Sequence, residues 1–351
     1  MLFPVMPVSE LTYARRIPAN AAPQRIADRT MRLRAGIVSV FVAIVIFVVK
    51  FGAYHVTGST AILSDALESV VNIVAAAFTL GSLAIASMPA DESHPYGHGK
   101  VEFLASGFEG GLIAFAALVI VYQAVEEIFL GRPIQDIDLG LALVIAAGIA
   151  NLALGFFLLQ AGRRTNSPAI VADGHHVISD FWTSAGVVVG LVLVRFTGWQ
   201  VLDPLVAAAV GTNLAVVGGR LCRRAVGGLL DESDPALLKK LTEVIQKVRT
   251  PAVIAVHRMR SFRSGGVAHV DAHVVVPCFW PVSKAHDLSD EFEIDVTRGI
   301  EQDAECIFHL DPCRAAYCAN CRVEPCPVRA HAFVADRDWS LPTLTGEAPQ
   351  D

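Results

Sequence analysis

Charged residues are scarce in this chain. Asp, Glu, Lys and Arg make up 18% of its 351 residues and hydrophobic residues make up 53%, and the mean hydropathy is +0.50. This composition excludes an ordinary soluble protein, in which about 25% of residues are charged. The first thirty residues contain no apolar core and no small-residue cleavage site, which predicts a mobile tail and argues against a signal peptide. No basic region interleaved with aromatic residues indicates a nucleic-acid partner.

Long apolar stretches are abundant instead. Six of them are each close to the roughly 20 residues that a helix needs to cross a bilayer. They lie near residues 35–57, 60–86, 104–126, 137–160, 170–195 and 200–220. The chain is therefore predicted to be a polytopic α-helical membrane protein with six transmembrane helices. An even number of spans places both termini on the same side of the bilayer.

Basic residues are distributed unevenly among the loops. One set of loops and tails carries Arg15, Arg16, Arg25, Arg29, Arg32, Arg34, Lys100, Arg163, Arg164, Arg220, Arg223 and Arg224. The opposite loops carry only Arg132 and Arg195. The positive-inside rule then predicts that both termini are cytoplasmic, in a multi-pass protein of the cell (inner) membrane.

A polar pattern appears twice inside these apolar stretches. The two stripes are Asp65, Glu68 and Asn72 in the second stretch, and Asp173, His176 and Asp180 in the fifth. Each stripe has a spacing of three and then four residues, so its members share one face of a helix. A single polar residue in a membrane helix often serves packing, but two matching stripes favour a site, since such groups are costly at membrane depth. Facing helices would bring Glu68, Asn72, His176 and Asp180 together as a four-ligand cation site.

The composition becomes polar from about Leu229, where a soluble domain is predicted to begin. Asp234-Pro235 combines a capping side chain with a proline at the first helical position, and Pro251 ends this helix. Strands over 253–262 and 267–276 flank a hairpin turn, and a helix over 283–302 and a strand over 305–310 follow. In the second strand, apolar residues alternate with His269, Asp271 and His273, so one face is core and the other carries potential ligands. The element order is α-β-β-α-β.

Several of these features together resemble the cation diffusion facilitator family. They are His94-Pro95-Tyr96-Gly97-His98-Gly99-Lys100 after the second span, the His176-x-x-x-Asp180 pair, the six spans and the α-β-β-α-β domain. The resemblance covers about residues 30–312. It implies a homodimeric exporter of divalent transition metals that exchanges them for protons by alternating access, with a ferredoxin-like cytosolic domain. The expected domains are a tail (1–33), a transport domain (34–225), a metal-sensing dimerisation domain (229–312) and a Cys-rich tail (313–351).

The family's transport site falls on the same four residues as the two stripes. The family most often has two Asp, or a His and an Asp, on the second span, where this chain has Glu68 and Asn72. The amide lowers the negative charge of the site relative to a carboxylate pair. The nitrogen ligand His176 favours zinc, iron, cobalt or nickel over magnesium and calcium, which take oxygen shells. We expect zinc first, with iron, cobalt, nickel or manganese as alternatives.

The resemblance implies two more metal sites and a charge pair. A loop site matches Asp91, His94 and His98, whose alternative role is to cap the third helix. A site in the soluble domain matches His257, His273, His286, His309 and Asp311, and metal bound there would act as a regulator. Lys100 matches a lysine that pairs at the dimer junction with an acid matching Asp231.

The cysteines are concentrated near the end of the chain. Cys313-x4-Cys318-x2-Cys321-x4-Cys326 has the count and the central pair of a tetrahedral zinc site. The first three also match the spacing of a plant-type iron–sulfur cluster. Reduced thiols in a flexible tail are the third possibility, since a cytosolic location argues against disulfides.

Two other functions fit the composition less well. An intramembrane metallohydrolase is disfavoured because the sequence contains no His-Glu-x-x-His motif, and no enzymatic activity is expected. A membrane-anchored metal sensor without transport is the remaining alternative. An anchor, however, does not need Glu68, His176 and Asp180 within its apolar stretches.

Overall fold

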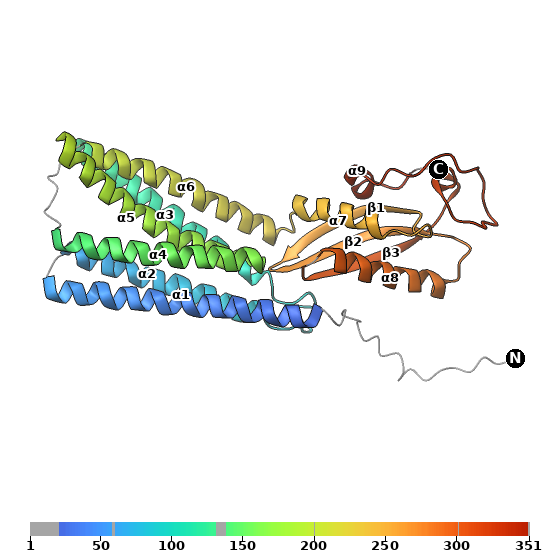
Figure 1. Cartoon of the computed structure of the whole chain (residues 1–351), viewed down its shortest axis with the longest axis horizontal. Helices are drawn as coiled ribbons and strands as arrows, with labels where there is room; N and C mark the ends of the chain where they lie inside the picture. The colour runs from blue at the N-terminus through green and yellow to red at the C-terminus, as the bar shows by residue number, and fades with distance from the viewer. Residues whose placement is uncertain (1–20, 58–59, 131–137, 200, 301, 350–351) are drawn as a thin grey trace.

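A computed structural model describes residues 21–349 except 58–59, 131–137, 200 and 301. Six long helices form one elongated bundle (Figure 1). They are α1 (Ala21–Thr57), α2 (Thr60–Ala86), α3 (Val101–Leu130), α4 (Asp138–Arg164), α5 (Pro168–Thr197) and α6 (Leu202–Leu229). Helix α1 packs along α2, α3 along α6, and α4 along α5. The predicted six-helix membrane domain is confirmed.

The outer surface of the bundle is apolar. Phe41, Phe115, Phe129 and Phe156 are each more than 60% exposed, as expected of side chains that lipid covers. Within the described residues, α1, α2, α3, α4 and α6 are long and apolar enough to cross a membrane. Helix α5 is as long as α3 but carries the second polar stripe.

Helices α3 and α6 approach each other closely. A Cβ atom on Gly218 of α6 would lie 2.7 Å from the backbone oxygen of Gly110 on α3. Only glycine fits at such a crossing, and small residues at helix interfaces bring membrane helices into direct backbone contact. This crossing holds α3 against the bundle and so fixes the position of the polar side chains on its other faces.

The domain that follows has the predicted α-β-β-α-β order. Its elements are α7 (Pro235–Val248), β1 (Ala255–Ser264), β2 (Val267–Val276), α8 (Val282–Ile300) and β3 (Ala304–Pro312). The Asp234 side chain accepts hydrogen bonds from the backbone N–H groups of Ala236 and Leu237, as expected of an N-cap. The sheet order is β1-β2-β3, with β1 antiparallel and β3 parallel to β2.

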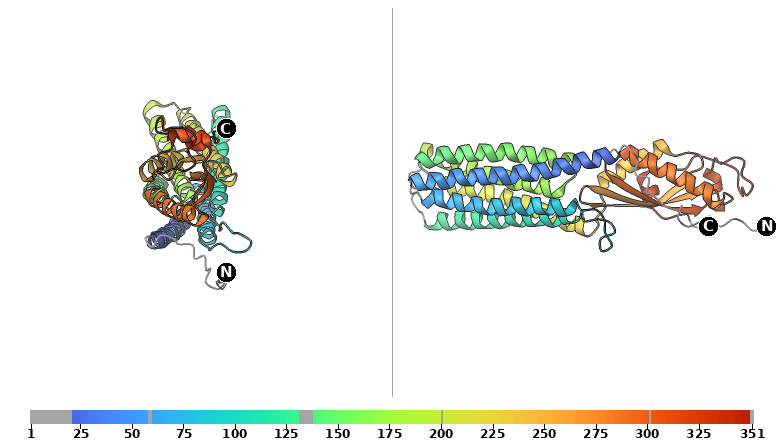
Figure 2. Two further views of the ribbon diagram at one scale, coloured as in Figure 1. Left: turned by 90° about the vertical axis from the view of Figure 1, so that its right-hand side faces the viewer. Right: turned by 90° about the horizontal axis from the view of Figure 1, so that it is seen from below.

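Helices α7 and α8 pack against one face of this sheet. The core between them contains Ala268, Val270, Ala272 and Val274, the apolar positions of the alternating strand β2. The opposite face of β2 therefore carries the polar residues that the alternation predicts. In Figure 1 and in the right-hand view of Figure 2, the domain continues the long axis of the bundle.

The segment after Pro312 packs against the domain. It contains a 3-10 helix, η2 (Ala315–Asn320), and a short helix, α9 (Leu341–Thr345). Trp339 and Leu344 are 7% and 0% exposed and belong to the same core as α7 and the sheet. The backbone N–H of Arg258 in β1 donates to the oxygen of Gly346 over 2.8 Å. The described part of this segment is therefore packed against the domain and does not form a flexible tail.

Truncation of Leu344 tests this packing. Leu344→Ala removes a fully buried side chain and should lower the free energy of unfolding of the cytosolic domain by about 2–5 kcal/mol. Urea unfolding of the detergent-solubilised protein, followed by intrinsic fluorescence, measures it. Val334→Ala is the control, since Val334 is 76% exposed. Equal midpoints for the two variants would show that the segment contributes nothing to the core.

Candidate metal centres

The central site of the bundle joins α2 to α5. Asn72 and Asp180 each follow the first residue of their helix by twelve positions, about 18 Å along the helix axis. Nδ2 of Asn72 donates to Oδ2 of Asp180 over 2.6 Å, and Nε2 of His176 lies 3.2 Å from Oδ1 of Asn72. The structure thus brings together three of the four predicted ligands. The side chain of Glu68 lies outside the described residues.

The orientation of the Asn72 amide indicates which ring nitrogen of His176 carries a hydrogen. Because Nδ2 donates to Asp180, the amide oxygen is the group that faces the imidazole, and a carbonyl oxygen can only accept. Nε2 of His176 therefore carries a hydrogen in this arrangement. A metal ion can replace it only after that proton leaves, because a ligating nitrogen must have its lone pair free.

A carboxylate from a third helix completes this centre. Glu109 of α3 is fully buried, and its Oε2 lies 3.5 Å from Nδ1 of His176. Thr79 of α2 donates to the other oxygen over 3.1 Å. The imidazole is thus held between Asn72 on one side and Glu109 on the other, an arrangement typical of histidines that bind metals.

Asp173, like Glu109, is a carboxylate that lies beside the predicted ligands without being one of them. It is 1% exposed, and its Oδ2 accepts no hydrogen bond among the described residues. Asp173, Asn72 and Asp180 line a cavity of about 20 Å³, the space of about one water molecule. Sequence reasoning placed Asp173 in the fifth-span stripe but not among the ligands, and it missed Glu109. The available signal was an acidic residue within the third apolar stretch.

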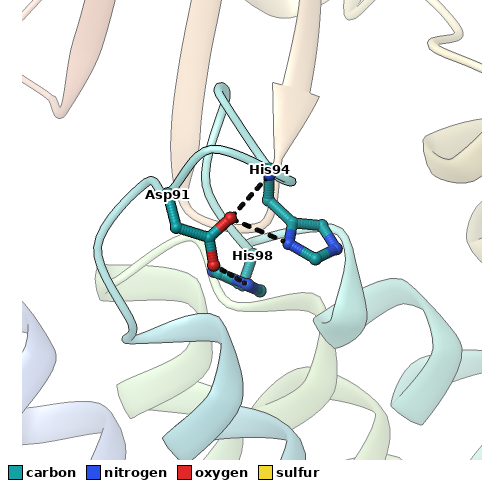
Figure 3. Close-up of side chains that lie close together, drawn as sticks. All are labelled: Asp91, His94 and His98. Atoms are coloured by element: carbon teal, nitrogen blue, oxygen red, sulfur yellow. Dashed lines mark hydrogen bonds and ion pairs between the residues drawn. The ribbon is translucent and has the colours of Figure 1, made fainter.

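The loop site lies between α2 and α3. Figure 3 shows the carboxylate of Asp91 facing both imidazoles: its Oδ1 lies 3.1 Å from Nδ1 of His94 and its Oδ2 lies 3.4 Å from Nε2 of His98. One ligand atom from each residue lies within 4.8 Å of the others. The hydrogen bond from the backbone N–H of His94 lowers the pKa of Asp91, and the two imidazoles act in the same direction. The carboxylate is therefore ionised at neutral pH and suited to a cation.

Two ion pairs lie where the bundle meets the cytosolic domain. Nζ of Lys100 lies 2.8 Å from Oδ1 of Asp231, so the predicted charge pair is formed in the structure. Arg32 of α1 lies 3.2 Å from Glu102 of α3, and its guanidinium packs against the β1–β2 turn, where a Cβ on Gly266 would collide with it. Helices α1 and α3 and the hairpin therefore share one junction.

The site in the cytosolic domain lies on one row of the sheet. His257, His273 and His309 are opposite one another in the register of the three strands, and Asp311 follows His309 on the same face. Oδ2 of Asp311 lies 3.0 Å from Nδ1 of His273 and 3.2 Å from Nε2 of His257, and its Oδ1 lies 2.9 Å from Nδ1 of His309. Four of the five predicted residues therefore converge.

The fifth predicted residue lies apart from this group. His286 is on α8, where its imidazole is 3.7 Å from Asp290. Within the four-residue group, burial lowers the pKa of His257 despite the opposing charge of Asp311. Burial by itself would raise the pKa of Asp311, but its hydrogen bond from His273 and the neighbouring imidazoles lower it. A neutral imidazole beside an ionised carboxylate is a pair ready to bind a metal.

The predicted cysteines surround one cavity. Cys313, Cys318, Cys321 and Cys326 line a space of about 110 Å³, and Cys278, from the loop before α8, lines it as well. Burial, together with the nearby thiols of Cys278 and Cys321, raises the pKa of Cys313 to about 11. The sequence gives no local signal for Cys278, which lies 35 residues before Cys313.

Both parts of the chain match models of known families. Residues 36–230 match the cation efflux transmembrane domain, and residues 234–313 match the cytoplasmic domain of cation efflux proteins. An uncharacterised transporter of Synechocystis sp., sll1263, is 40% identical over 79% of this chain and 89% of its own length. The cation-efflux pump FieF of Escherichia fergusonii is 30% identical over 80% of this chain and 92% of the pump. FieF of Escherichia coli K12 is equally similar.

Proposed function

Because this chain belongs to the cation efflux family, we propose that it exports a divalent transition metal from the cytoplasm in exchange for protons. The family is the cation diffusion facilitator family that the sequence resembles, and its members are metal cation transporters. The observation that carries the finer proposal is the Asn72–His176–Asp180 group at mid-bundle depth. It links two helices through side chains that are metal ligands in other proteins.

The geometry of this group supports a direct exchange of metal for protons. In the inward-open state, a cytosolic ion takes Nε2 of His176, the carboxylate of Asp180 and the amide oxygen of Asn72, with Glu68 as the proposed fourth ligand. The Nε2 proton must leave first. Glu109 then accepts the remaining N–H of the imidazole and holds the ring in place. In the outward-open state, protons from outside return to the same atoms and release the metal.

The ligand set favours a transition metal. One nitrogen and several oxygens suit zinc, iron, cobalt, nickel and manganese, whereas magnesium and calcium take oxygen alone. We propose zinc as the preferred substrate. An aspartate in place of Asn72 would add one negative charge to the site. The nearby acidic groups Glu109 and Asp173 supply negative charge instead.

The cytosolic domain is proposed to sense metal within a homodimer. His257, His273 and Asp311 each present a ligand atom within 4.8 Å of the others. Metal bound on this row of the sheet would make the conformation of the β1–β2 hairpin depend on the cytosolic metal concentration. The turn of this hairpin contacts Arg32 of α1. We propose that the inner membrane is the site of action and that both termini are cytoplasmic. The alternative function is a membrane-anchored metal sensor. Such a sensor would have the same cytosolic metal site and the same membrane location, but it would not transport metal.

Flux measurements distinguish the exporter from the sensor. The full chain in proteoliposomes should accumulate zinc, reported by a metal-sensitive dye, when a pH gradient is imposed, and zinc entry should release protons from the vesicles. Empty liposomes and a reversed gradient are the controls. Zinc binding by the purified protein without any flux above empty liposomes would support the sensor instead.

Substituting the amide by a carboxylate tests the metal choice. Asn72→Asp adds a negative charge beside Asp180 and should tighten zinc binding by about 10-fold, with a changed order of affinity among zinc, iron, cobalt and manganese. Isothermal titration of the purified protein with each ion measures the change. Gln160→Glu, at an exposed position of α4, is the control. Affinities that are identical to those of the unaltered protein would remove Asn72 from the ligand set.

A further inference from the structure

The cavity lined by Cys278, Cys313, Cys318, Cys321 and Cys326 lies at the end of the cytosolic domain, within and beside the segment that follows β3. This segment is at the end of the domain away from the bundle (Figures 1 and 2). It lies beyond the region that the cytoplasmic family model matches, which ends at residue 313. The match to the cation efflux family therefore does not extend to Cys318, Cys321 and Cys326.

The sulfur atoms are not gathered around one point that a single metal ion would occupy. Four thiolates around a tetrahedral zinc with bonds of about 2.3 Å lie about 3.8 Å from one another. Among the described residues, which include all five of these cysteines, no three sulfurs lie within 4.8 Å of one another. They surround an open space of about 110 Å³ instead. A four-iron cluster keeps its thiolate sulfurs about 6 Å apart and fills a space of that order.

The walls of the cavity also suit a buried cluster. Backbone N–H groups of Cys278 and Ala330 each lie 3.4 Å from a sulfur, that of Cys313 and Cys318 respectively. Such N–H···S contacts stabilise the charge on sulfur ligands of iron–sulfur clusters. Tyr317 and Cys321 are buried in a small apolar core with Ile254, Ala255 and Val275, which shields one side of the cavity from water.

An arginine holds the loop around the cavity. The guanidinium of Arg329 donates to the backbone oxygens of Cys318, Cys321 and Val323, the shortest contact being 2.8 Å to Val323. Arg314 and Arg329 both line the cavity, so two positive charges lie beside the thiols. A site with four thiolates carries excess negative charge, and these guanidinium groups compensate for it.

We infer that Cys313, Cys318, Cys321 and Cys326 bind a four-iron iron–sulfur cluster, and that Cys278 contributes its backbone N–H to Cys313. On binding, each of the four thiols loses its proton and its sulfur bonds to one iron atom of an assembled cluster. No electron is transferred in this step. The inference does not depend on transport, because it concerns a cavity outside the bundle, three of whose four proposed ligands lie beyond the matched family domains.

The test uses the full chain, purified anaerobically in detergent and then incubated with ferric iron, sulfide and a thiol reductant, which supplies the two electrons that each four-iron cluster takes up during assembly. We expect about four iron atoms and four acid-labile sulfides per chain, with a broad absorption band near roughly 400 nm. Cys318→Ser and Cys326→Ser should each lose most of this iron and colour. Cys278→Ser should keep the cluster, because its side chain, which contacts the Cys313 thiol, is not one of the four proposed ligands.

Cys222→Ser is the matched control, since Cys222 lies in α6 and lines no part of this cavity. A chain that retains about one zinc and no sulfide would overturn the inference, and so would a chain that binds neither metal. Retention of the full iron and sulfide content in Cys318→Ser and Cys326→Ser would place the cluster elsewhere and overturn it as well. None of these outcomes depends on zinc flux, so failure of the cluster and failure of the exporter are distinguishable.

Discussion

Asp180→Ala is expected to reduce zinc flux by about 100-fold or more while the protein remains folded. The carboxylate of Asp180 is the partner of Asn72 at 2.6 Å and the one formally charged group among the three described ligands. Without it, the two remaining described ligands are an amide and an imidazole, both neutral when they bind a metal. Removing a carboxylate ligand leaves more of the double charge uncompensated at mid-bundle depth, which is strongly unfavourable.

The measurement is proteoliposome flux, with elution volume and helix content checked for each variant. Asp180→Asn keeps the volume of the side chain and should be equally inactive, which separates charge from packing. Asp290→Ala is the control, because Asp290 is 55% exposed on α8. Flux near that of the unaltered protein in both Asp180 variants would exclude the proposed site.

The regular parts of the fold follow from local patterns in the sequence. Strand β2 was predicted over 267–276, as the structure has it, because alternating apolar residues determine both the strand and its buried face. The N-cap at Asp234 is another local signal. The stripe spacing predicted that Asn72, His176 and Asp180 share a centre, since helical periodicity fixes which side chains lie on one face.

Other features of the site and of the domain core depend on contacts between segments that are distant in the sequence. Glu109 lies 67 positions before His176, and no local spacing links one acidic residue of α3 to an imidazole of α5. Trp339 and Leu344 fill the domain core, but their short apolar segment has no periodicity that shows where it packs. His286 has the residue type of a ligand, yet only tertiary structure shows that α8 holds it beside Asp290.

Glu109→Gln should lower zinc affinity by about 10- to 100-fold and reduce by about one the number of protons released for each zinc bound. In the proposed zinc-free state, Nδ1 of His176 carries a proton that faces Oε2 of Glu109, 3.5 Å away, while Nε2 also carries a hydrogen towards Asn72. Zinc displaces the second of these protons. With glutamine, the amide donates to Nδ1, so the imidazole holds a single hydrogen on Nε2. Zinc then only moves that hydrogen to Nδ1, as the amide turns to accept it with its oxygen, and no proton leaves the ring.

Titration of zinc in two buffers with different ionisation enthalpies counts the released protons. Glu126→Gln is the matched control, because Glu126 lies on the same helix α3 but far along it from His176. A merely structural role for Glu109 would weaken binding and leave the proton count unchanged. Equal proton release by the Glu109→Gln and Glu126→Gln variants would therefore show that Glu109 does not act on His176. A loss of about one proton in the Glu109 variant alone would make this carboxylate the group that couples the imidazole to proton exchange.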